Sequence, residues 1–263
     1  MASSANQAAL LAEIAGWQIE IIVQGYPGKS VCHGGLGWST IALLRGHGRV
    51  ALIDVGSFSQ RSLILARLGA HGLTPADVTD VLLTHSHWDH SINWVMFPKA
   101  RIAIGVKELA WSLQEPWGTS PVPELYVREL DRSKQTSLIK AGDEVLPAFR
   151  VYDMPGHTPG HVMFMLNGGE RDVIFTGDAA KNRAELLSLT ADMSYDQTVS
   201  RKSMERMWEL WREKPGTIVV PGHDVPMVLV ADKPAYIGKR AAAISSWFGE
   251  TLDQTKLFEL TAR

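Results

Sequence analysis

Short apolar runs alternate with amphipathic segments along most of the chain. Apolar and β-branched runs predict strands at 17–24, 40–44, 50–55, 80–83, 101–104, 137–139, 144–152, 161–166, 172–176 and 217–221. Helical spacing predicts helices at 59–68, 107–113, 183–189, 196–213 and 239–250, and we interpret 8–15 as a short helix or a ragged end. Groups of strands followed by helices predict sheet layers covered by helices, which is an α/β architecture.

The chain length fits one large domain or two small ones. With 263 residues and 45% hydrophobic residues, the chain can bury an ample core. No clear linker or internal repeat interrupts it, so we expect a single catalytic domain over 1–263. The segment 114–135 combines four-residue polar spacing with several prolines, and we interpret it as a lid or loop insertion with a short helix.

Composition excludes several classes of function. No apolar run approaches ~20 residues, so no membrane span is expected. The first sixteen residues carry no basic side chain and do not resemble a signal peptide, which favours a cytoplasmic location. The single cysteine, Cys32, excludes an internal disulfide and is expected to be a buried free thiol. A formal charge of −2 gives no electrostatic case for nucleic acid, and nine tryptophans favour an aromatic pocket and a homodimer contact.

The most informative segment lies between residues 84 and 90. Three of the nine histidines, His85, His87 and His90, stand there together with Asp89. Imidazole and carboxylate are the usual ligands of zinc and similar cations, whereas clustered imidazoles without a metal repel one another when protonated. The segment follows the apolar run 80–83, and the ends of strands are where α/β folds place their chemistry. This pattern predicts a metal site rather than a run of surface polar residues.

Three later segments repeat the same design of an apolar strand followed by a ligand-type side chain. They deliver His157, Asp178 and His223. A single histidine after a strand is more often a hydrogen-bonded core or loop residue. Seven candidate ligands at four strand ends rarely arise by coincidence, and together they predict one metal centre.

These motifs resemble those of the metallo-β-lactamase-fold hydrolases, the superfamily of glyoxalase II and the quorum-quenching lactonases. The pattern His-x-His-x-Asp-His stands at 85–90, and the Leu-Ile-Asp-x-Gly pattern contains Asp54. The resemblance implies an αββα sandwich of two mixed sheets flanked by helices, with two metal ions at the sheet edge. It assigns the first metal to His85, His87 and His157, the second to Asp89, His90 and His223, and a bridging role to Asp178.

The implied activity is hydrolysis of a small carbonyl substrate such as an ester, lactone, thioester or amide. Two divalent ions, zinc first with manganese or iron as alternatives, would generate a bridging hydroxide near neutral pH. Asp89 or Asp178 would carry a proton. We expect Asp54 and His161 to orient the ligands from behind, since metal-bound imidazoles usually donate their second N–H to a carboxylate or carbonyl. The alternatives are that Asp54 caps the following turn and that His161 is a packed strand residue.

The chain also departs from its relatives. Lactonases of the family usually carry a tyrosine three residues after the bridging aspartate, where this chain has Lys181, and the glycines after the first motif are replaced by Ser91-Ile92-Asn93-Trp94. Lys181 is either a substrate-binding cation or a solvated lysine at a helix start. The tryptophans near the first motif, Trp88, Trp94, Trp111 and Trp117, are either ordinary core residues or an aromatic wall for a small apolar or aromatic acyl group. The expected substrate contacts are Lys181, Trp88, Trp94 and Trp117.

Other functional classes remain open. Persulfide dioxygenases resemble this family but bind one iron through two histidines and an aspartate, so a mononuclear iron oxygenase is the main alternative. The full second set of ligands disfavours it. A nuclease is disfavoured by the neutral charge, and a metal-binding protein without catalysis is disfavoured by the complete ligand set and the expected lid.

Overall fold

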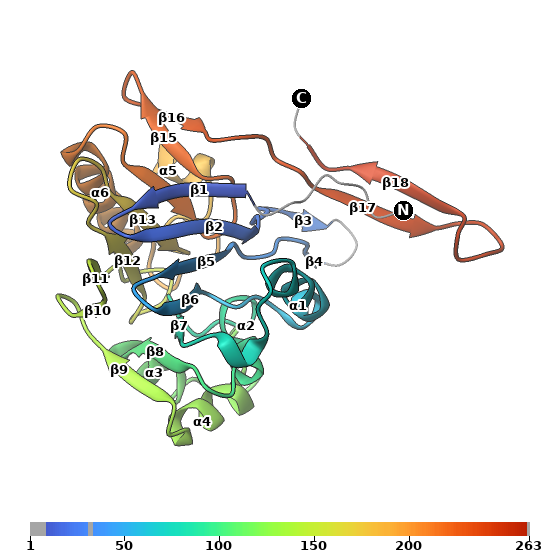
Figure 1. Cartoon of the computed structure of the whole chain (residues 1–263), viewed down its shortest axis with the longest axis horizontal. Coiled ribbons are helices and arrows are strands. Elements are labelled where there is room, and N and C mark those ends of the chain that lie inside the picture. Colours follow the sequence, from blue (N-terminus) through green and yellow to red (C-terminus); the bar gives the residue numbers. More distant parts are fainter. Residues whose placement is uncertain (1–8, 31–33, 262–263) are drawn as a thin grey trace.

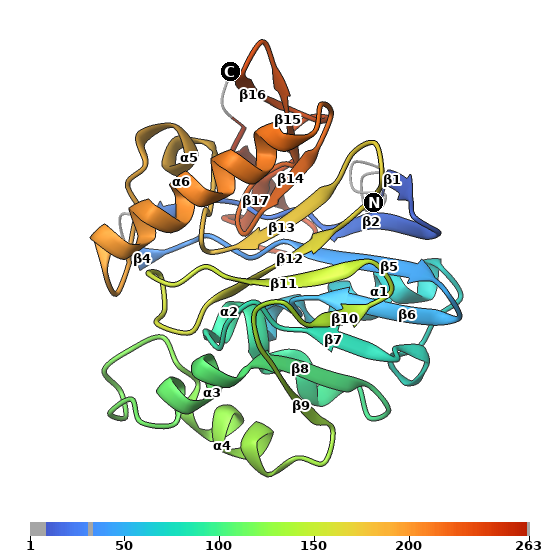
Figure 2. The same ribbon diagram turned by 90° about the vertical axis from the view of Figure 1, so that its left-hand side faces the viewer.

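The computed structural model describes residues 9–30 and 34–261. Two seven-stranded sheets pack face to face, and helices cover their outer faces (Figures 1 and 2). The expected αββα sandwich is confirmed. Cys32 lies outside the described residues. No helix in the described part of the chain is both long and apolar enough to cross a membrane.

The first sheet has the order β1-β2-β5-β6-β7-β8-β9, with parallel pairing from β6 to β9 and antiparallel pairing elsewhere. The strands predicted at 40–44 and 50–55 are present as β5 and β6, which form an antiparallel hairpin. The strands are β1 (Ala9–Ile14), β2 (Trp17–Val23), β5 (Ile41–Gly46), β6 (Arg49–Ile53), β7 (Asp80–Leu82), β8 (Arg101–Gly105) and β9 (Thr136–Ile139).

The second sheet has the order β10-β11-β12-β13-β14-β15-β16, and its parallel pair is β13 with β14. Two small ribbons lie outside the main sheets. The strands are β10 (Glu144–Leu146), β11 (Phe149–Asp153), β12 (Val162–Leu166), β13 (Val173–Gly177), β14 (Ile218–Pro221), β15 (Met227–Val230) and β16 (Lys233–Tyr236), with ribbons β3 (Lys29–Ser30)–β4 (Gly34–Gly35) and β17 (Ala243–Trp247)–β18 (Thr255–Glu259).

Three apolar layers hold the sandwich together. The inner layer joins both sheets through side chains such as Trp17 and Phe149, whose rings meet edge to face at 5.6 Å. The second layer packs the first sheet against α1, α3 and α4, and the third packs the second sheet against α5 and α6. The helices are α1 (Arg61–Ala70), α2 (Trp88–Ser91), α3 (Val106–Ser112), α4 (Glu124–Arg132), α5 (Arg183–Ser188) and α6 (Gln197–Glu213), with short 3-10 turns at Phe58–Gln60, Pro75–Asp77 and Ile92–Met96.

Several sequence-based expectations were wrong. Residues 9–14 form edge strand β1 rather than a helix. The strand expected at 144–152 is a hairpin, because the chain turns at Ala148, which has a positive φ of 65°. The helix expected at 239–250 is replaced by β17, which pairs with β18 in an exposed ribbon that projects from the body (Figure 1).

One edge of the sandwich collects the ends of four strands. Because β6 and β7 run parallel, Asp54 and the loop at 83–87 emerge side by side. The parallel pair β13 and β14 likewise delivers Asp178 and His223 together. This is the edge at which strands of α/β proteins present functional side chains, and it positions the candidate site.

Candidate metal centre

The histidine loop is fixed at both ends by hydrogen bonds. Asp54 accepts the Thr84 N–H at 2.9 Å and the Thr84 hydroxyl at 2.8 Å. At the far end, the Ser91 hydroxyl donates to the carbonyls of Ser86 at 2.8 Å and His87 at 3.0 Å. Between these anchors the loop has little freedom, so its imidazoles are held in place by the fold.

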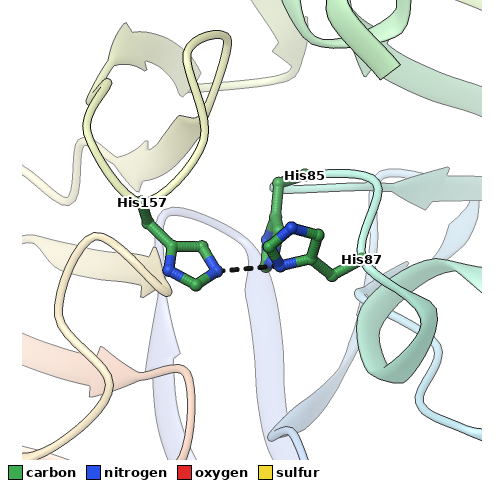
Figure 3. Close-up of side chains that lie close together, drawn as sticks. All are labelled: His85, His87 and His157. Carbon is green, nitrogen blue, oxygen red and sulfur yellow. Dashed lines mark hydrogen bonds between the residues drawn. The ribbon is translucent and has the colours of Figure 1, made fainter. Parts of the chain in front are cut away.

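The first group of ligand-type atoms comes from His85, His87 and His157, and all three side chains are buried. Figure 3 shows the rings of His85 and His87 from one loop facing the ring of His157 from another. His157 Nε2 lies 2.9 Å from His87 Nδ1. Among the described residues, buried His85 Nε2 has no hydrogen-bond partner. A buried imidazole nitrogen with no partner beside two others is what a cation site requires.

The second group comes from Asp89, His90 and His223. The Nε2 atoms of His90 and His223 lie 3.2 Å apart, and Asp89 Oδ2 lies 3.4 Å from His223 Nε2 and 3.7 Å from His90 Nε2. Asp89 stands in the first turn of α2, where a carboxylate is favoured by the helix dipole. Two imidazole nitrogens and a carboxylate converge on one point.

Asp178 stands between the two groups. Its Oδ2 lies 3.3 Å from His157 Nε2, and its Oδ1 lies 3.2 Å from Nε2 of both His90 and His223. The candidate ligand atoms within each cluster lie no more than 4.8 Å apart. Nitrogen and oxygen donors in two such clusters, joined by a carboxylate, fit two borderline divalent cations.

The electrostatics separate the histidines into two kinds. Burial lowers the pKa of His85 and His157 well below the usual value and that of His87 to about 4. Burial also acts on His90 and His223, but the carboxylates of Asp178 and Asp89 together outweigh it and raise the pKa of both, with Asp54 adding to the effect on His90. The first three are therefore held as neutral imidazoles, the form that binds metals. For the other two, the nearby carboxylates favour the protonated form, so a cation that binds there would displace a proton.

Two further residues support the candidate ligands from behind. His90 Nδ1 lies 2.8 Å from Asp54 Oδ2, which leaves His90 Nε2 free to face the site. His161 Nε2 accepts the backbone N–H of Asp178 at 3.0 Å, and burial lowers the pKa of His161 to about 3. Asp54 has a positive φ of 54°, an unfavourable conformation for a non-glycine residue that is found where structure is held for function.

Sequence reasoning missed Glu108, a fully buried carboxylate on α3. It accepts the Ser86 N–H at 2.9 Å and the Ser86 hydroxyl at 2.8 Å with one oxygen, and the Thr158 hydroxyl at 2.7 Å with the other. It thereby joins the histidine loop to the loop of His157. The only available signal was a glutamate within an otherwise ordinary helix pattern, which does not reveal its direction.

A profile of the metallo-beta-lactamase superfamily matches residues 34–223. The chain belongs to the metallo-beta-lactamase superfamily. A hydroxyacylglutathione hydrolase from Jannaschia sp. (strain CCS1) is 33% identical over 179 residues, covering 67% of this chain and 58% of the relative. An N-acyl homoserine lactonase from Bacillus sp. is 27% identical over 157 residues, covering 59% of each. The chain therefore matches less than two thirds of the length of these curated relatives.

A solved structure supports the superfamily fold. The dizinc quorum-quenching lactonase AidC, in complex with a product, superposes with a TM-score of 0.71 at 15% identity, covering 89% of this chain and 99% of that one. At this identity the likeness concerns the fold alone. The αββα arrangement agrees with it.

In this member of the superfamily the candidate metal centre opens into a cavity of about 930 Å³. Of the expected substrate contacts, Trp88 and Lys181 line it. Trp94 is instead 5% exposed and packs in the layer between the first sheet and its helices, because its 3-10 turn faces the core. Trp117 lies outside the cavity lining and is 54% exposed beneath the guanidinium of Arg128, 4.6 Å from its ring centre.

Trp111, which belongs to the same group of tryptophans near the first motif, does line the cavity, and Tyr195 lies beside it. Trp111 and Tyr195 meet edge to face at 5.9 Å. Pro121 and Met193 also line the cavity. The segment expected to be a lid reaches the cavity at 115–121, while the buried side chains Val127 and Leu130 anchor its helix α4.

Proposed function

We propose that this chain is a dinuclear metal-dependent hydrolase of a small carbonyl substrate, either an ester, lactone, thioester or amide. The observation that carries this proposal is Asp178, which stands between two groups of three ligand-type side chains. His85, His87 and His157 would hold one divalent ion and Asp89, His90 and His223 the other. Zinc fits the nitrogen-rich donor set best, with manganese or iron as alternatives.

When bound, two divalent ions polarise a carbonyl oxygen and lower the pKa of water to ~7, which removes the need for a serine or cysteine nucleophile. The protein supplies the other functions. Asp89 lines the cavity and is half-buried, so its carboxylate can exchange a proton with a bound substrate. Asp178 is buried and touches histidines of both groups, so it fixes their separation.

The cavity supports a substrate with an apolar or aromatic acyl group. Trp88, Trp111 and Tyr195 offer ring surface close to the candidate ligands, and the Trp111 ring lies 6.3 Å from that of His87. Aromatic walls with few polar groups favour small organic ligands. We propose that residues 115–121 act as a lid that shapes the entrance to this space.

The complete second group favours the hydrolase over a one-iron oxygenase of the persulfide dioxygenase type. Such an oxygenase would need two histidines and an aspartate, which leaves Asp89, His90 and His223 without a purpose. The names of the relatives, a hydroxyacylglutathione hydrolase and an N-acyl homoserine lactonase, also favour thioester or lactone cleavage.

A panel of lactones, thioesters, esters and amides tests the proposal on protein whose metal content has been measured. Turnover of at least one class is expected, with loss of ~100-fold or more in Asp178→Asn because the link between the two groups is removed. The matched control is Asp153→Asn, a carboxylate on β11 that pairs with exposed Lys107 at 2.5 Å. Undiminished turnover in Asp178→Asn would refute the bridging role.

A further inference from the structure

Lys181 occupies the cavity wall three residues after Asp178, yet its ammonium is already engaged. It donates to the carbonyl of Asp192 at 2.5 Å and to the Glu185 carboxylate at 3.3 Å. Only 12% of the side chain is exposed. An ammonium has three donors, and two of these point into the protein. Lys181 is therefore poorly placed to hold a substrate carboxylate.

Glu185 completes the arrangement from α5. Its Oε1 accepts the backbone N–H of Asp192 at 2.7 Å, and its Oε2 accepts the backbone N–H of Lys181 at 2.8 Å. The side chain of Glu185 is 5% exposed. Lys181 and Glu185 thus bind both the carbonyl and the N–H of Asp192. We call this pair and the backbone that it holds the 181–185 clamp.

The clamp fixes the position of Met193, the residue that follows Asp192. Met193 has a positive φ of 53°, which non-glycine residues rarely adopt unless neighbouring contacts enforce it. In this conformation the carbonyl of Met193 lies 2.8 Å from His157 Nδ1. A carbonyl accepts only, so it fixes the proton on Nδ1 and leaves the lone pair on Nε2. That Nε2 faces His87 and Asp178.

The backbone of Lys181 touches a second ligand-bearing segment. Its carbonyl accepts the N–H of His223 at 2.8 Å. Lys181 therefore contacts the strand end that carries His223 directly. It reaches the ring of His157 through the Met193 carbonyl and also by its own Nζ, which lies 3.5 Å from His157 Nδ1. Lys181 therefore connects several loops through its hydrogen bonds, and its ammonium is not a free cation at the cavity surface.

We propose that Lys181 and Glu185 are positioning residues that hold the Met193 carbonyl against His157 and so set the tautomer and direction of this imidazole. The proposal rests on the proposed function in that His157 is taken as a metal ligand. It assigns Lys181 a role other than the substrate contact expected from the sequence. Metal-bound imidazoles commonly depend on such an outer partner.

Three variants test the clamp: Lys181→Met, Glu185→Gln and the double variant. Metal affinity is measured by competition with a chromogenic zinc chelator, and folding is checked by circular dichroism. Each single variant is expected to bind zinc ~10–100-fold more weakly, and the double variant about as weakly as the worse single one, because the pair acts as a unit. Lys29→Met is the matched control. It removes the other lysine of the cavity wall, whose exposed pair with Asp192 at 2.8 Å is solvated, and should change zinc affinity less than ~3-fold.

A second readout uses metal-free protein and does not depend on the proposed function. Hydrogen exchange at the Asp192 amide should accelerate in both single variants, and ¹⁵N shifts of the His157 ring should show loss of the single Nδ1–H tautomer. Unchanged exchange and an unchanged tautomer would overturn the proposal. So would zinc affinity equal to wild type together with a KM increase confined to substrates that carry a carboxylate. Wild-type protein that binds no zinc would instead refute the proposed function, while the exchange and the tautomer would still decide the clamp.

Discussion

Glu108 provides the sharpest test of how the metal centre is held together. Its carboxylate accepts both the N–H and hydroxyl of Ser86 and the hydroxyl of Thr158, and the Gly160 N–H also donates to it. Ser86 stands between His85 and His87, and Thr158 follows His157. Removal of the carboxylate therefore releases the two loops that carry the first group of candidate ligands.

The size of the effect follows from the groups left without a partner. Glu108→Ala leaves two backbone N–H groups, those of Ser86 and Gly160, without an acceptor, and these groups cannot rotate away as hydroxyls can. At ~1–3 kcal/mol for each buried unsatisfied donor, the free energy of unfolding should fall by ~2–6 kcal/mol. Glu108→Gln keeps an oxygen for Ser86 but points an NH₂ group at the Gly160 N–H. This variant leaves one donor without an acceptor and should lower the free energy of unfolding by ~1–3 kcal/mol.

Urea denaturation of metal-free protein, followed by tryptophan fluorescence, measures both values. Glu129→Ala removes an exposed glutamate from α4 and serves as the control, with an expected change within ~0.5 kcal/mol. The reasoning is refuted if Glu108→Ala lies within ~1 kcal/mol of wild type. It is equally refuted if Glu108→Gln costs as much as Glu108→Ala, since the preserved acceptor would then contribute nothing.

Three further predictions concern the same site. Gly222→Ala would place a methyl group in direct overlap with Asp178 Oδ1, so zinc affinity measured by chelator competition should fall at least ~10-fold. An unchanged affinity would contradict this placement of Asp178. Asp54→Asn turns an NH₂ group toward either Thr84 or His90, and a loss of ~10–100-fold in zinc affinity is expected, whereas a loss below ~3-fold would show that His90 needs no such partner. Burial raises the pKa of Glu108 above its usual value of 4.5, so the stability it contributes is complete below that pH and is lost as pH rises through the folded-state pKa. The difference in free energy of unfolding between wild type and Glu108→Gln, measured on metal-free protein, should therefore decrease as the pH is raised above 4.5. A difference that increases with pH would contradict the direction of the pKa shift.

The sequence predicted the candidate metal ligands better than it predicted the residues that hold those ligands in position. Ligand-type side chains at strand ends are visible as His85-Ser86-His87 after an apolar run, because the chemistry and the strand pattern coincide. Glu108 carries no such mark, since its role depends on the direction of one side chain toward two distant loops. The same holds for Lys181, whose occupied ammonium could be recognised only with Glu185 and Asp192 in place.

The fold was predictable where apolar runs were continuous and bounded by turn residues. Prediction failed at the turn of Ala148, which divides the expected strand 144–152, and at the two ends of the chain. The run at 9–14 is rich in alanine and leucine and favours a helix by intrinsic preference, but pairing with β2 overrides it. The segment 243–247 likewise forms a strand only because β18 lies beside it. The apolar pattern of one segment does not show which other segment will pair with it as a strand.

The tryptophans show the limit of reading side-chain direction from spacing. Trp88, Trp94 and Trp117 are close in sequence, yet Trp88 lines the cavity, Trp94 packs in the core and Trp117 stacks with Arg128. Helical and 3-10 turns in this segment are too short to establish a face. The expected homodimer and cytoplasmic location stay predictions, and sedimentation velocity would test the first.

The central claim is that two divalent ions lie in the groups joined by Asp178 and support hydrolysis. Elemental analysis of purified protein, combined with substrate turnover before and after chelation, tests it most directly. Two zinc-like ions per chain are expected, with turnover lost on chelation and restored by two equivalents of zinc. One ion of iron per chain with oxygen uptake, or full turnover in metal-free protein, would contradict it.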